Sequence, residues 1–172
     1  MFGRIDWAQD LTSSLIVVVA CTAFITDLVT GKIYNWLTLP SLVIGLAWHS
    51  LINGLSGLGQ SLLGVGVGLL FYGALYAWNI VAGGDVKLLM AFGALKGWRY
   101  VLDVGITSII LGAGLAIVSL LYHRQLRDFI RRIHWSIQSL LHPALKPELP
   151  KLDQSKKIPF GVPMAIAGVW AL

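Results

Sequence analysis

The sequence contains few charged residues and little cysteine. Asp, Glu, Lys and Arg make up 12% of its 172 residues, about half of the share that is usual in soluble domains. Together with a hydrophobic share of 56%, this composition excludes an ordinary cytosolic enzyme and a disordered chain. The single cysteine, Cys21, can form neither an internal disulfide nor a four-cysteine zinc site. The class that remains is a polytopic membrane protein, and its 19 glycines suit close helix packing in lipid.

Six apolar segments predict an all-α protein with about six transmembrane helices, organised as a single integral-membrane domain over residues 1–172. A helix needs about 20 residues to cross the hydrocarbon core. The third and fifth segments exceed this length easily, whereas the fourth is short. In chain order, the segments cover about 11–28, 37–52, 61–82, 86–95, 101–122 and 158–172.

The distribution of basic residues predicts the orientation of the chain in the membrane. Ten of the thirteen Lys and Arg fall on one side of the predicted spans, and only Arg4, Lys96 and Arg99 fall on the other. The side with ten is expected in the cytoplasm of an inner-membrane protein, with both termini outside. The positive charge is therefore assigned to orientation and not to nucleic acid.

The connection over 123–157 carries four arginines between apolar residues at helical spacing. It is predicted to be a basic amphipathic helix on the cytoplasmic leaflet. Two roles stay open for it, a topology anchor and a docking site for substrate.

Two of the eight acidic residues, Asp27 and Asp85, adjoin apolar segments where the chain meets the membrane. Ionisable residues at such depth mark functional sites by default. Two spans and their turns account for the 58 positions between them, so both are expected at the cytoplasmic face. Two adjacent carboxylates share a proton and can hydrolyse a peptide bond by general acid–base catalysis, without metal or cofactor. The alternatives are a helix-end cap or a pair with Lys32 for Asp27, and a helix N-cap for Asp85.

The residues around Asp85 suggest a substrate cleft. Gly83 and Gly84 permit a positive φ and a close approach by an extended substrate, although a plain helix-breaking turn explains them as well. Lys87 is expected either to stabilise a carboxylate or to extend to the interface. Asn35 is expected to cap the second helix or to line the cleft.

Three segments resemble the type IV prepilin peptidases: Asp27–Thr38, Gly83–Leu88 and Ile158–Pro163. Ala82 stands where the first glycine of the family's Gly-x-Gly-Asp motif is expected, and Tyr34 stands where the family often has proline. The resemblance implies that Asp27 and Asp85 are catalytic. It also implies a prepilin or pilin-like substrate, cut at the cytoplasmic face after a short basic leader, and no metal or cofactor. The single cysteine and the ten or so residues before the first span suggest a short form with peptidase activity alone.

Two other functions fit the same residues. An intramembrane Asp pair also serves a small transporter or a proton-relay subunit, although transporter sites usually lie nearer the midplane. The chain also fits an inactive structural subunit of a pilus or secretion assembly. Membrane lipid is an expected partner, a homo-oligomer is possible, and no nucleic acid is expected.

Overall fold

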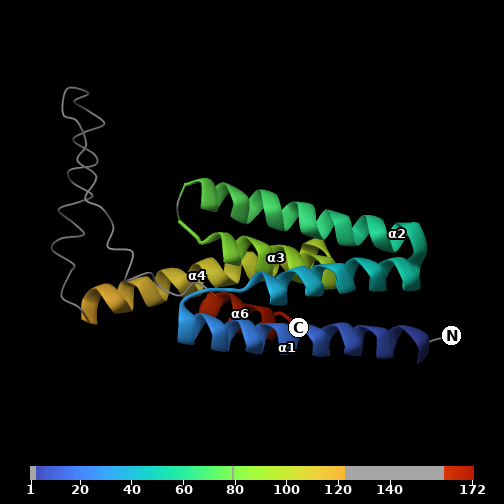
Figure 1. Cartoon of the computed structure of the whole chain (residues 1–172), viewed down its shortest axis with the longest axis horizontal. Coiled ribbons are helices and arrows are strands. Elements are labelled where there is room, and N and C mark those ends of the chain that lie inside the picture. Colours follow the sequence, from blue (N-terminus) through green and yellow to red (C-terminus); the bar gives the residue numbers. More distant parts are fainter. Residues whose placement is uncertain (1–2, 79, 123–160) are drawn as a thin grey trace, which may run out of the picture. The chain divides into compact units, whose positions relative to one another are not determined.

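The computed structural model describes residues 3–78, 80–122 and 161–172, and over this part its regular structure is entirely α-helical. The all-α prediction is therefore confirmed for the described residues, while the predicted basic connection over 123–157 lies outside them. The helices are shown in Figure 1: α1 (Gly3–Thr30), α2 (Asn35–Ala77), α3 (Gly83–Lys96), α4 (Trp98–Tyr122) and α6 (Gly161–Trp170).

The chain separates into two compact units. The first combines Met1–Gly112 with Pro159–Leu172, and the second is Ala113–Ile158. Of the second unit, the structure describes only the end of α4. All the packing and site geometry that follow belong to the first unit.

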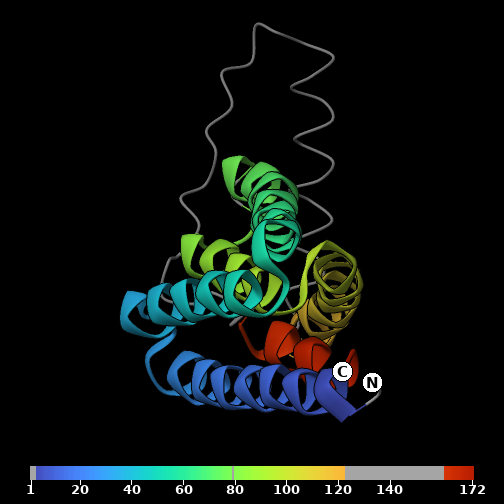
Figure 2. The ribbon, with the colours of Figure 1, turned by 90° about the vertical axis from the view of Figure 1, so that its right-hand side faces the viewer.

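Among the described residues, three helices are long and apolar enough to cross a membrane: the Asp10–Thr30 part of α1, all of α2, and the Trp98–Val118 part of α4. Helix α2 covers both the second and the third predicted segments as two arms. The chain reverses between the arms at Gly54 (φ 60°, ψ −143°). The two arms run antiparallel in Figures 1 and 2. Helix α3 has 14 residues and so rises only about 21 Å, less than the hydrocarbon thickness of about 30 Å.

Helix α3 lies between the two arms of α2, as both views show (Figures 1 and 2). Glycines make this approach possible: a Cβ at Gly64 would lie 2.2 Å from the Gly93 carbonyl oxygen of α3, far inside normal contact. The last carbonyls of α3 are then satisfied by side chains of both arms. Ser61 Oγ donates to the Ala94 oxygen at 2.7 Å, and His49 Nε2 lies 2.9 Å from the Leu95 oxygen. This packing fixes α3, and with it the residues of its first turn.

Helix α6 packs against α1 and α3 and is tied to α4 by a hydrogen bond from the Tyr100 hydroxyl to the Gly168 carbonyl oxygen. The end of α1 and the starts of α3 and α6 lie at the same end of this unit, on the left in Figure 1. Three segments that are distant in the sequence therefore meet at one place.

Candidate active site

Asp27 occupies the last turn of α1 and is only 6% exposed. Its carboxylate lies against the first turn of α6, beside the backbone of Gly161 and Val162. Its Oδ2 atom is buried and has no hydrogen-bond partner among the described residues. Lys32, which is exposed, forms no ion pair with it in the described structure. The carboxylate therefore faces the interior beside α6 and keeps one oxygen unengaged.

Asp85 is the third residue of α3 and is 3% exposed. Its Oδ2 atom accepts the backbone N–H of Ala82 at 3.0 Å. The alternative that made Asp85 the N-cap is wrong, because Ala82 is the N-cap and Asp85 stands three residues later. Ala82 has an ordinary extended backbone (φ −84°, ψ 155°), so alanine in place of the motif's first glycine causes no strain.

Asp27 and Asp85 are both buried, and each lies within electrostatic range of the other. Two other acidic residues have a described burial, Asp10 and Asp103, and both are exposed. A buried charge is costly unless it is paired, hydrogen-bonded or neutralised by a proton. Two adjacent carboxyl groups with few donors around them are the arrangement that binds one shared proton. Chemically, such a pair can give a proton to one atom and take a proton from another.

Gly83 and Gly84 do not form the turn expected from the sequence. Both belong to the first turn of α3, and the described glycines with positive φ are Gly31, Gly54 and Gly97. The positive-φ expectation is therefore wrong, and the expected approach by an extended substrate stays a prediction. A Cβ at Gly84 would lie 3.0 Å from Ile33 Cβ, tighter than most real contacts, while one at Gly83 would meet Tyr76 at an ordinary 3.5 Å.

Lys87 and Asn35, separated by 52 positions, are joined in the structure. Lys87 Nζ donates to Asn35 Oδ1 at 2.9 Å, on the exposed side of the first turns of α2 and α3. The expectation that Asn35 caps the second helix is wrong, because the N-cap is Tyr34, which makes no side-chain capping hydrogen bond. The side chain of Asn35 instead holds the lysine of the Gly-Gly-Asp-Val-Lys segment.

Comparison with known proteins identifies the family. Residues 14–117 match the profile of the type IV leader peptidase family. This chain belongs to that family. It is 35% identical over 163 residues to a prepilin leader peptidase/N-methyltransferase of Aeromonas hydrophila, and 34% identical over 165 residues to one of Aeromonas salmonicida. Each match covers 91% of this chain but 46% of the relative, so the chain spans about half the length of these relatives. No solved structure matches it.

Two residues that lie beside the carboxylates, Gly161 and Ile33, were not predicted from the sequence to belong to the site. Gly161 was noted only as part of the segment before the last helix, yet a Cβ there would lie 2.6 Å from Asp27 Oδ2. Ile33 was likewise noted only as part of the Asp27–Thr38 segment, since an isoleucine near a membrane segment is ordinary. Its position between the first turns of α3 and α6 follows from the tertiary packing alone.

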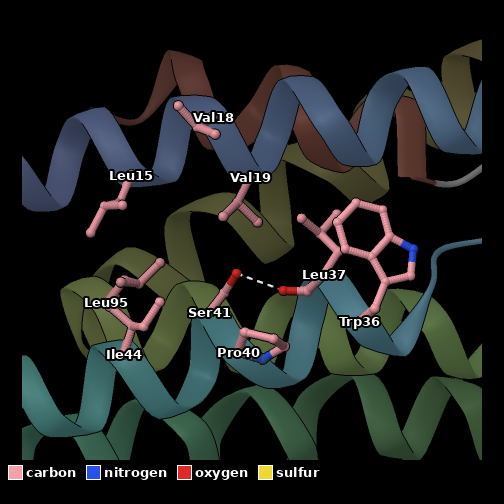
Figure 3. A pocket seen from close by; sticks show the side chains of 9 residues that line it. All are labelled: Leu15, Val18, Val19, Trp36, Leu37, Pro40, Ser41, Ile44 and Leu95. Atoms are coloured by element: carbon pink, nitrogen blue, oxygen red, sulfur yellow. Dashed lines mark hydrogen bonds between the residues drawn. The ribbon is translucent and has the colours of Figure 1, made fainter.

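An apolar pocket of about 210 Å³ lies between α1 and the first arm of α2 (Figure 3). Trp36 stands at one end of it, and the hydroxyl of Ser41 is engaged with the Leu37 carbonyl oxygen at 2.7 Å. Neither Asp27 nor Asp85 is among its lining residues. The pocket is therefore separate from the carboxylate pair and offers it no polar partner.

Proposed function

We propose that this chain is a membrane-embedded aspartyl endopeptidase that removes the short basic leader from type IV prepilin or pilin-like precursors. The observation that carries the proposal is the burial of Asp27 and Asp85, within electrostatic range of each other. Membership of the type IV leader peptidase family supports the same activity, as do relatives that are named for prepilin leader peptidase activity.

The carboxylate pair performs the reaction by general acid–base hydrolysis. The ionised carboxylate removes a proton from a water molecule, which attacks the carbonyl carbon of the scissile peptide bond. The protonated carboxyl group donates to the carbonyl oxygen, and the resulting tetrahedral species breaks down with a proton delivered to the leaving amine. No covalent intermediate with the enzyme forms. The shared proton belongs to the pair, so the acid and base roles are assigned to both residues together.

The first turns of α2 and α3 form the edge of the proposed cleft. Gly83 and Gly84 carry no side chain beside Asp85, and Lys87 is held by Asn35 at the exposed side of the same turn. A polypeptide that reaches the carboxylates past this edge meets backbone and a fixed cation. We place this cleft at the cytoplasmic face of the inner membrane, within a bundle of about six transmembrane helices.

The test is cleavage of a candidate precursor by the purified full-length chain in liposomes. The expected result is two products whose masses sum to the mass of the precursor plus one water molecule. The smaller product is the basic leader. Asp27→Asn and Asp85→Asn are expected to remove the activity, because an amide can neither accept nor supply the shared proton. Asp103→Asn is the matched control, since Asp103 is exposed and lies on α4. Wild-type cleavage by either site variant would refute the proposal.

A further inference from the structure

Ile33 lies in the short connection between α1 and α2, six positions after Asp27, and is partly buried. On one side it meets the first turn of α3: a Cβ at Gly84 would lie 3.0 Å from Ile33 Cβ and 3.3 Å from its carbonyl oxygen. Gly84 directly precedes Asp85 in the sequence. The contact therefore limits how closely the turn carrying Asp85 approaches the end of α1.

On its other side, Ile33 meets the first turn of α6. A Cβ at Gly161 would lie 3.0 Å from Ile33 Cδ1 and 2.6 Å from Asp27 Oδ2. Gly161 thus touches both Asp27 and Ile33. Ile33 therefore meets the turn that holds Asp85 through its Cβ and backbone, and the turn beside Asp27 through its Cδ1, and glycine stands at both points of contact.

We propose that Ile33 is a positioning residue that sets the spacing between the carboxylates of Asp27 and Asp85. This inference rests on the proposed peptidase function. Close packing transmits small displacements, because a removed side chain leaves a void into which its neighbours relax only in part. Loss of the Ile33 atoms beyond Cβ therefore lets the first turn of α6, which lies against Asp27, shift toward the connection, while the contact with Gly84 remains. The Asp27 carboxylate then moves relative to that of Asp85.

The kinetic test compares Ile33→Ala with Ile33→Val. Both variants keep the Cβ that meets Gly84 and lose the Cδ1 that meets Gly161, and Ile33→Ala also loses both γ-carbons. Since a misplacement of about 1 Å can reduce a rate about 100-fold, we expect Ile33→Ala to lower kcat about 10- to 100-fold with little change in KM. Ile33→Val leaves the smaller void and is expected to lower kcat less than Ile33→Ala. Ile16→Ala, at a fully buried position of α1, is the control: it lowers thermal stability without lowering kcat. A wild-type kcat in Ile33→Ala overturns the proposal.

A second measurement reports the spacing without any substrate. The background carries Cys21→Ser, Asp27→Cys and Asp85→Cys, and thiol cross-linkers of increasing length are applied to the intact chain. Adding Ile33→Ala is expected to lower the yield with the shortest effective reagent. Adding Gly84→Ala, which places a methyl against Ile33, is also expected to lower this cross-linking yield. This variant replaces Ile33→Ala if the latter does not accumulate in the membrane. Unchanged yields in both overturn the role of Ile33. Absence of precursor cleavage by the wild type instead refutes the peptidase function, and the cross-linking result then decides the role of Ile33 separately.

Discussion

Replacing Gly161 with alanine tests how strictly the site depends on the position of the Asp27 carboxylate. The new Cβ would lie 2.6 Å from Oδ2 and 2.8 Å from Cγ, whereas ordinary contact begins near 3.4 Å. Either the carboxylate or the first turn of α6 must therefore move by about 0.8 Å. At an active site a displacement of about 1 Å can cost about 100-fold in rate, so Gly161→Ala is expected to lower kcat about 50- to 100-fold.

Two controls separate this displacement from a general loss of stability. Gly168→Ala, in the same helix, would place a Cβ 2.9 Å from the Phe92 ring and away from the carboxylates. It is expected to lower the midpoint of thermal unfolding while the folded protein keeps its kcat. Gly66→Ala, whose Cβ would meet no atom within 4 Å, is expected to change neither quantity. The assay is precursor cleavage by purified protein at saturating substrate. A Gly161→Ala enzyme with wild-type kcat would show that Asp27 tolerates the shift and would refute the reasoning.

Two further predictions concern the cleft edge and the orientation in the membrane. Lys87→Met and Asn35→Ala each remove the 2.9 Å hydrogen bond and should lower kcat/KM about three- to tenfold, the modest range of exposed charged contacts. Because the two residues act through one hydrogen bond, the double variant should lose no more activity than either single variant. An additive loss would argue against a joint role. In a Cys21→Ser background, a cysteine introduced at Ser56 near the α2 kink should react with an impermeant thiol reagent from the periplasmic side, and one introduced at Thr30 near Asp27 only from the cytoplasmic side; the reverse pattern would contradict the orientation.

The sequence was sufficient to predict the helical class and the two buried acids, for physical reasons that particular residues illustrate. Acidic residues are so rare in this chain that those next to apolar segments stand out, and Asp27 and Asp85 are indeed buried together. The break between the second and third apolar segments corresponds to the kink at Gly54, where the two antiparallel helical arms of α2 meet (Figure 1). The two predicted segments are therefore the two arms.

The details around Asp85 were predicted less well, because they depend on tertiary contacts. A glycine pair before an acid suggests a turn, but here both glycines are helical, and the absence of a side chain at Gly84 matters because Ile33 lies against it. The pairing of Lys87 with Asn35 joins residues 52 positions apart, and no local pattern indicates it. Gly161 owes its importance to Asp27, which approaches it from the opposite end of the sequence.

A double-mutant cycle decides whether Asp27 and Asp85 act as one unit. Residues that act together lose nearly all their effect when either is removed, so their losses are grossly non-additive. Cleavage rates are measured for Asp27→Asn, Asp85→Asn and the double variant, each reconstituted at equal amounts with the same precursor. If the two residues act as one unit, each single variant is as inactive as the double variant. Losses that multiply from the single variants to the double variant, or substantial cleavage by either single variant, would contradict it.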